Sequence, residues 1–150
     1  LLAPILESAA AHNTAVVYVD RDMRLETDGI TAELYAPADA GDANERCVMC
    51  RVSLGSFDML ITGDAPIAAE RALIAEHDIR GVEVYVVGHH GSKYSSGEEL
   101  LSSIGADTAV ISVGYNNYGH PTSETLERLA GNGYSVYRTD EDGRVELHVR

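Results

Sequence analysis

The spacing of hydrophobic and polar residues changes along the chain between a helical period and short apolar runs, and this predicts a succession of helices and strands. Helical spacing of apolar residues predicts helices at residues 1–11, 66–77 and 98–104, and a fourth that begins at Thr122 or Ser123 and ends by 131–133. Short apolar runs predict strands, and two hairpins join pairs of them at 55–56 and 140–143. The predicted strands are residues 14–20, 30–36, 47–54, 57–62, 82–87, 108–113, 134–139 and 144–149. Residues 37–44, rich in Asp, Ala and Gly, predict a loop. The pattern is typical of an α/β protein.

Size and charge limit the classes of function. A chain of 150 residues with 45% hydrophobic residues can form one domain with its own core. The net charge of −13 argues against a general nucleic-acid binder, which needs a basic surface. Two segments differ from this average: residues 84–97 contain no acid and one base, Lys93, and residues 109–123 contain no charged residue. A site that accepts an anion could lie there.

Cys47 and Cys50 form a single CxxC motif with no second ligand pair at zinc-knuckle spacing. Their odd spacing on a predicted strand places them on opposite faces, which favours buried core thiols. We find no apolar run that could span a bilayer and no signal peptide. The chain begins at Leu1 without Met, so we expect a piece of a longer protein.

Three loops that follow predicted buried strands carry candidate side chains. In layered α/β proteins, sites assemble at the carboxyl ends of strands. A carboxylate, Asp64, and an imidazole, His89 or His90, at such ends suit a zinc-type hydrolytic site. Two adjacent histidines usually point apart, so we expect His89 to be the ligand and His90 to orient a neighbour or contact substrate. The alternatives are that Asp64 is the N-cap of the next helix, and that the histidines only form a turn.

The same loops carry residues that could contact a substrate. His120, between Gly119 and Pro121, could donate to a phosphate oxygen or a leaving group, or could simply stand at a helix entry. The predicted substrate-binding residues are Ser92, Lys93, Ser95, Asn117, Tyr118 and His120.

Four motifs follow one another in a characteristic order. They are Ile61-Thr62-Gly63-Asp64, Val87-Gly88-His89-His90-Gly91-Ser92-Lys93 with Ser95-Ser96, Ile111-Ser112-Val113-Gly114 with Asn117-Tyr118-Gly119-His120-Pro121, and Tyr137-Arg138-Thr139-Asp140-Glu141-Asp142-Gly143. Over about the whole chain, this series resembles the C-terminal metallo-β-lactamase-fold domain of the ComEC family of DNA-uptake competence proteins. The resemblance implies an αβ/βα sandwich and a phosphodiesterase or nuclease-like hydrolase acting on DNA. It also implies two divalent metal ions, Zn or Mn, in each complete domain.

The resemblance assigns roles to three positions. Asp64 matches the metal-bridging aspartate, and His89 or His90 matches the late metal-binding histidine. His120 matches the histidine of the family's YGHP motif, for which we expect substrate contact. Asp64 and His120 are therefore the predicted catalytic residues, and Asp64, His89 and His90 the predicted metal ligands.

The chain departs from the family pattern in two places. The first family signature, HxHxDH, is absent, and the family's Asn-Glu-Asn-Ser segment is replaced by Asn44-Glu45-Arg46-Cys47. Asp64 and one of the two histidines give two protein ligands, fewer than the three usual in a catalytic zinc site. We therefore expect the chain to be the second half of a hydrolase domain, inactive alone, whose partner is the missing N-terminal half. The parent would be a membrane protein and this domain a soluble, extracytoplasmic part of it. Exposed apolar strands would favour self-association.

Two other hypotheses remain open at this point. One keeps the fold and changes the substrate, giving an esterase that acts on a small phosphorylated or acyl compound. The other is a non-catalytic scaffold module, for which the absence of HxHxDH is the best support.

Overall fold

The computed structural model describes residues 2–37 and 46–149, and its elements confirm the α/β class. The helices in this part of the chain are α1 (Leu2–Ala11), α2 (Ile67–Glu76), α3 (Glu98–Ile104) and α4 (Ser123–Gly131), with a short 3-10 turn, η1, at Gly88–Gly91. The strands are β1 (Met23–Thr27), β2 (Ile30–Tyr35), β3 (Met49–Leu54), β4 (Phe57–Ile61), β5 (Val84–Val86), β6 (Thr108–Ile111) and β7 (Ser135–Arg138). Of the predicted loop at 37–44, all but Pro37 lies outside the described residues.

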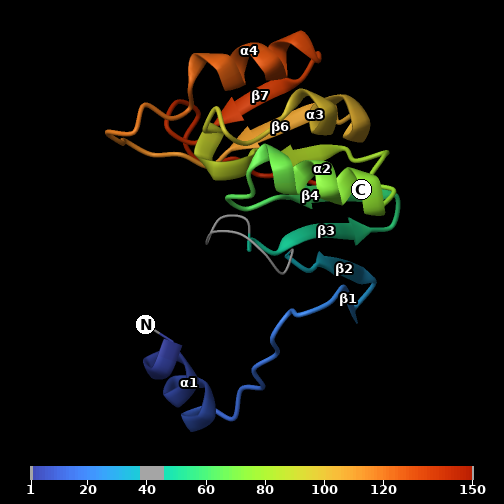
Figure 1. Ribbon diagram of the computed structural model, residues 1–150, viewed down its shortest axis with the longest axis vertical. Helices are drawn as coiled ribbons and strands as arrows, with labels where there is room; N and C mark the ends of the chain where they lie inside the picture. The colour runs from blue at the N-terminus through green and yellow to red at the C-terminus, as the bar shows by residue number, and fades with distance from the viewer. Residues whose placement is uncertain (1, 38–45, 150) are drawn as a thin grey trace.

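The strands form one mixed sheet in sequence order, from β1 to β7. Strands β1 to β4 pair antiparallel, and β4 to β7 pair parallel. Each parallel step passes through one helix to the next strand in the same direction. Because such crossovers are right-handed, α2, α3 and α4 lie on one face of the sheet. In Figure 1, α2 lies in front of the strands, and α4 stands next to β7 at the top of the view.

The hydrophobic core lies between these helices and the parallel strands. Its central strand residues are fully buried, as are the helix residues that pack on them. They include Leu60, Tyr85, Ala109 and Ile111 from the strands and Leu73, Leu100, Leu101, Ile104 and Leu129 from the helices. The short apolar runs at β5 and β6 thus form strands of the parallel part of the sheet, as predicted, but only their helix side is buried throughout. Val86, Thr108 and Val110, on the other face, are partly exposed.

The opposite face of β2, β3 and β4 is also apolar. Side chains alternate between faces along a strand, and the register aligns one apolar set across all three strands. This apolar face consists of Ile30, Ala32, Leu34, Cys50, Val52, Leu54, Phe57, Met59 and Ile61. None of the nine is buried, and Ile30 and Leu54 are 39% and 41% exposed. In the described part of the chain, no helix covers this face.

The strand predicted at residues 14–20 is wrong. This segment is irregular, and Val16, Val17 and Tyr18 are 46%, 64% and 62% exposed. The first strand is instead β1, which pairs with β2 through the two-residue turn Asp28-Gly29. Both turn residues have positive φ, 47° and 81°, as the favoured hairpin turn requires. In Figure 1 an extended segment separates α1 from the sheet.

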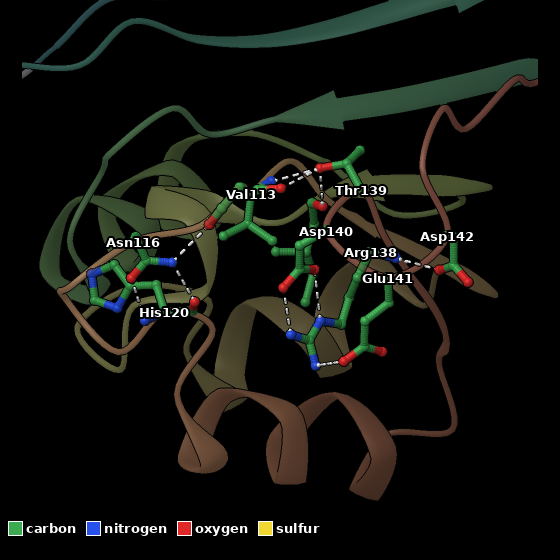
Figure 2. Close-up of polar contacts among 10 residues, drawn as sticks. Val113, Asn116, His120, Arg138, Thr139, Asp140, Glu141 and Asp142 are labelled. Carbon is green, nitrogen blue, oxygen red and sulfur yellow. Dashed lines mark hydrogen bonds and ion pairs between the residues drawn. The ribbon is translucent and has the colours of Figure 1, made fainter.

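The second strand of the predicted C-terminal hairpin is also wrong, because residues 144–149 are irregular. The turn after β7 closes on the strand itself. The N–H of Arg138 donates to the Asp142 carboxylate at 2.7 Å, and the Arg138 carbonyl accepts from the N–H groups of Glu141 and Asp142. Figure 2 shows the Arg138 side chain paired with Asp140 and Glu141 in the same turn. These contacts use the backbone groups that a returning strand would need.

The two cysteines are free, as predicted, but they are partly exposed rather than buried. Cys47 precedes β3 and packs against the core, and Cys50 lies on the apolar face. Among the helices of the described residues, none has the length and hydrophobicity needed to cross a membrane.

Candidate functional site

The segments with candidate chemistry meet at one edge of the sheet. Because β4 to β7 are parallel, their carboxyl ends lie side by side. The residues that follow are Asp64 after β4, His89 and His90 after β5, His120 after β6 and Thr139 after β7. In Figure 1 the segment after β6 extends beyond this edge as the orange loop at the left. The topology therefore brings together the three loops that the sequence singled out.

The turns after β4 and β5 are joined by their backbones. The N–H of His89 donates to the carbonyl of Gly63 at 2.9 Å. Gly88 permits this approach, since a Cβ at that position would lie 2.9 Å from Thr62 Oγ1 and 3.3 Å from the Gly63 carbonyl oxygen. Asp64 directly follows Gly63 and is partly exposed. The carboxylate and the imidazole therefore extend from two turns in direct contact.

Asp64 is not the N-cap of α2. The helix begins at Ile67, and its N-cap residue is Pro66. The N-cap hypothesis for Asp64 is therefore wrong. Its assignment as a metal ligand and catalytic residue stays a prediction.

The two adjacent histidines point to different neighbours. Both have left-handed backbone conformations, with φ of 50° and 55°. The ring of His89 meets the ring of His120 edge-on, with centroids 5.7 Å apart. The Nδ1–H of His90 donates to the Ser112 carbonyl at 2.7 Å, so Nδ1 carries its proton. His89 therefore faces the His120 loop, while His90 is held by the end of β6.

Asn116 organises the loop that carries His120. Its amide nitrogen donates to the carbonyls of Gly114 at 3.0 Å and His120 at 2.7 Å. Its amide oxygen accepts from the N–H groups of Tyr118 and His120, both at 3.1 Å. Figure 2 shows this side chain inside the loop, next to the His120 ring. From the sequence, Asn116 was known to lie in this loop, but its structural role was not predicted. Asn117, for which we expected substrate contact, is exposed.

The environment of His120 favours a neutral imidazole. Burial lowers the pKa of His120 below its usual value, and the nearby His89 and His90 lower it further. Its Nδ1 atom is buried and has no hydrogen-bond partner among the described residues. A neutral ring has one N–H and one lone pair, so it can donate to an oxygen or accept a proton.

The predicted substrate-binding residues of the β5 loop have different environments. Ser92 and Ser95 are 2% and 0% exposed. The Ser95 hydroxyl donates to the Ala65 carbonyl at 2.8 Å, and the Ser92 hydroxyl oxygen accepts the Tyr94 N–H at 3.4 Å. Lys93 is exposed, with its ammonium 5.3 Å from the centroid of the Tyr94 ring. Substrate contact by these residues stays a prediction; in this structure the serine hydroxyls hold the loop.

Two buried residues that support the site were missed at the sequence level. The Glu70 carboxylate of α2, 1% exposed, accepts the N–H groups of Ser96 at 2.6 Å and Gly97 at 2.8 Å. The Tyr85 hydroxyl contacts Thr62 Oγ1, Ser96 Oγ and the Gly88 N–H. For Glu70 a sequence signal was available: it lies three residues after Ile67 and three before Leu73, on the apolar side of α2.

A cavity of about 350 Å³ adjoins the His120 loop. Its lining residues are His90, Ser112, Val113, Gly114, Tyr115, Asn116, Tyr118, His120 and Thr139. Across the described ranges, no three His, Cys, Asp or Glu side chains gather into a group that could hold a metal ion. The carboxylate of Asp64 and the imidazole of His89 are donors of the right chemistry for part of such a site.

Comparisons with known proteins give three relatives, although no protein-family model matches the chain. It is 30% identical to ComE operon protein 3 of Bacillus subtilis over 149 residues, which are 97% of this chain and 19% of that protein. It is 33% identical to Competence protein ComA of Neisseria gonorrhoeae over 130 residues, 84% of the chain and 19% of the relative. It is 36% identical to Recombination protein 2 of Haemophilus influenzae over 124 residues, 80% of the chain and 15% of the relative. The chain thus spans about a fifth or less of each relative's length. It is a homologue of one segment of the ComEC family of competence proteins.

Proposed function

We propose that this chain is the second half of a metallo-β-lactamase-type hydrolase domain that cleaves phosphodiesters of DNA during competence DNA uptake. The observation that carries the proposal is the contact between the Asp64 and His89 turns. The 2.9 Å hydrogen bond from the His89 N–H to Gly63 holds a carboxylate and an imidazole at adjacent strand ends, with His120 facing His89. A carboxylate and an imidazole on adjoining turns are two of the ligands that a hydrolytic metal site needs.

The relatives support the DNA part of the proposal. Two of them are named for competence or the com operon, and the third for recombination. The chain's net charge of −13 would repel DNA, but residues 84–97 and 109–123, which supply the loops after β5 and β6, contain no acid. After β7, at the same edge, Asp140 and Glu141 are paired with Arg138. A phosphodiester could therefore approach over the loops after β5 and β6.

The apolar face supports a sandwich completed by further chain. Nine apolar side chains on β2, β3 and β4 share this face, and none of them is buried. A face of this kind needs a covering layer, and in a sandwich that layer is a second sheet. The relatives are about five times longer than the matched segment. We propose that the rest of the domain, with the missing metal ligands, packs here. If that half is absent, the face would favour self-association.

Asp64 and His89 would hold a divalent ion, Zn or Mn, two of which are expected in the complete domain. When bound, such an ion polarises a phosphoryl oxygen and lowers the pKa of a water molecule. The Asp64 carboxylate would supply negative charge at the ion and hold it at the end of β4. His90, tied to Ser112, would keep the double-histidine turn in place.

His120 would act on the substrate rather than on the metal. Burial and the nearby His89 and His90 lower the pKa of His120, which favours the neutral ring. From the loop beside His89, its N–H would donate a hydrogen bond to a phosphate oxygen or to the leaving-group oxygen as negative charge develops there, without giving up its proton.

Metal binding by the chain is the first test. We expect weak binding of Mn²⁺ or Zn²⁺ in calorimetric titrations, and weaker binding after Asp64→Asn or His89→Asn. Asparagine suits position 89 because it tolerates the left-handed backbone conformation there. His148→Asn is the matched control, since the His148 side chain is 81% exposed and far along the chain from the site. Tight binding that survives both site substitutions would refute the ligand assignment.

Activity is the second test, and it needs the full-length protein. We expect metal-dependent DNA cleavage by that protein and none by these 150 residues alone. His120→Ala should keep the metal content, measured by elemental analysis, and lose about 10²–10⁴-fold in rate. A metal-free His120→Ala protein would make His120 a ligand, and full activity would make it a bystander.

One observation favours the scaffold alternative: no group of three candidate ligands occurs within the described residues. A full-length protein that binds no metal and cleaves no DNA would support that alternative. Cleavage of small phosphorylated or acyl compounds, without action on DNA, would support the esterase.

A further inference from the structure

Two tyrosines beside the candidate site are almost fully exposed. Tyr115 is 98% exposed and Tyr118 is 84% exposed, and both belong to the loop that carries His120. Such large aromatic surfaces contribute nothing to the core. Exposed aromatic residues that adjoin a cavity are candidates for ligand contact.

The loop holds the tyrosines in a defined place. Asn116 makes four hydrogen bonds to backbone groups of the loop, and one of its acceptor contacts is to the N–H of Tyr118. Where the loop leaves β6, the Thr139 hydroxyl accepts from the Val113 N–H at 2.8 Å and donates to the Val113 carbonyl at 2.7 Å. Figure 2 shows both anchors. The aromatic rings therefore stand on an ordered loop, so their stacking on a ligand would cost little ordering entropy.

The adjoining cavity suits a flat, uncharged group such as a nucleobase. Both tyrosines line it, and it contains about 350 Å³. Its described lining includes no Asp, Glu, Lys or Arg. Asn116, Thr139 and the Nδ1 of His90 already bond to backbone groups of the protein. Asn116 and Thr139 are therefore not free to read the edge of a base, and His90 has only its Nε2 atom left, so recognition would come mainly from the aromatic faces.

The ring of Tyr118 also lies beside the proposed chemistry. It is nearly parallel to the ring of His120, with centroids 6.1 Å apart. A base on the tyrosines would thus leave its own phosphodiester close to His120.

We infer that Tyr115 and Tyr118 form a stacking platform for unpaired bases, so the substrate at this site is single-stranded DNA. The inference rests on the proposed function and narrows its substrate class. Paired bases hide their faces inside the duplex, whereas every unpaired base has a face that can stack on an aromatic ring. Binding should therefore prefer single strands and depend little on sequence.

The test measures binding by the 150-residue chain to fluorescent oligonucleotides at low ionic strength. The probes are oligothymidylate, a mixed-sequence strand, its duplex, and an abasic strand with the same number of phosphates. We expect the two single strands to bind more tightly than the duplex and the abasic strand. Tyr118→Ala should weaken single-strand binding by roughly 5- to 150-fold, since stacking of one base contributes about that much. Tyr118→Phe should keep most of it.

Tyr94→Ala is the matched control. Tyr94 is 67% exposed but lines a different hollow, between α3 and α4. The Tyr94→Ala variant should bind single strands as tightly as the wild type does. As a second measurement, a strand with 5-iododeoxyuridine should crosslink to Tyr115 or Tyr118 under ultraviolet light.

Three results would overturn the platform: no single-strand binding by the wild type, equal binding of abasic and normal strands, or equal losses in Tyr118→Ala and Tyr94→Ala. Tighter binding of the duplex than of the single strands would refute single-stranded DNA as the substrate class. Metal titration without DNA, with Asp64→Asn and His89→Asn, tests the proposed function separately. If the wild type binds metal as expected but Tyr118→Ala binds single strands as tightly as the wild type does, the platform is refuted and the proposed function is not.

Discussion

Replacing Glu70 by alanine should destabilise the protein more than any exposed substitution in α2. The carboxylate is 1% exposed and accepts the backbone N–H groups of Ser96 and Gly97. Both donors are buried, and Gly97 is the N-cap of α3. Each buried N–H left without an acceptor costs about 1–3 kcal/mol, so two cost about 2–6 kcal/mol. Removal of the buried charge offsets part of this, and we expect a net loss of about 2–4 kcal/mol.

Glu70→Gln separates hydrogen bonding from packing. Glutamine keeps the shape, but its single amide oxygen can serve one N–H while its NH₂ faces the other. We expect a loss of about 1–3 kcal/mol, from one unsatisfied N–H. Glu76→Ala, in the exposed last turn of the same helix, should change the free energy of unfolding by less than about 0.5 kcal/mol.

The assay is urea unfolding followed by circular dichroism, with midpoint and slope fitted for each variant. Burial raises the pKa of Glu70 above its ordinary value of 4.5, and the two N–H groups and Arg128 oppose that change. A raised pKa in the folded state means that stability is lost as pH rises from about that ordinary value through the folded pKa. The wild type should therefore gain stability relative to Glu70→Gln as pH falls through this window. An unchanged midpoint for Glu70→Ala, or a more stable Glu70→Gln at neutral pH, would refute the reasoning.

Three further outcomes follow from buried contacts and thiols. Tyr85→Phe removes a hydroxyl with three buried partners and should cost about 1–3 kcal/mol in the same assay; no change would contradict the network. Gly91→Ala should cost about 1–3 kcal/mol, because φ is +85° and the new Cβ would lie 2.5 Å from the Cβ of Pro121; Gly131→Ala, with no atom within 4 Å, is the control. Both cysteines should react with a thiol reagent in the unfolded, non-reduced protein, and a recovery below two thiols would show an unexpected disulfide.

The position of the candidate side chains could be predicted from sequence. Short apolar runs followed by Gly and a ligand-type residue identified the strand ends at Asp64 and His89, and parallel pairing then placed them at one edge. Helix α4 was equally predictable, because Thr122 supplies a side-chain cap that accepts the Thr125 N–H. These features are local, so spacing and residue type determine them.

Hairpin partners were less predictable. The apolar run at residues 14–20 has no adjacent strand in the described fold and stays irregular. The Asp28-Gly29 pair is a local sequence signal for a hairpin turn and so for β1. The prediction followed the apolar run at residues 14–20 instead. After β7, the Asp142 carboxylate competes for the Arg138 N–H, so alternation at residues 144–149 does not produce a strand.

Long-range contacts belong to the tertiary structure alone. Glu70 reaches backbone donors 26 and 27 residues away, and His89 meets the His120 ring across 31 positions of sequence. The apolar face likewise exists only because the register aligns residues of three strands. Local spacing determines which side chains follow which strand. The hydrogen-bond donors around a buried charge, and an apolar face that runs across several strands, form only when distant segments pack together.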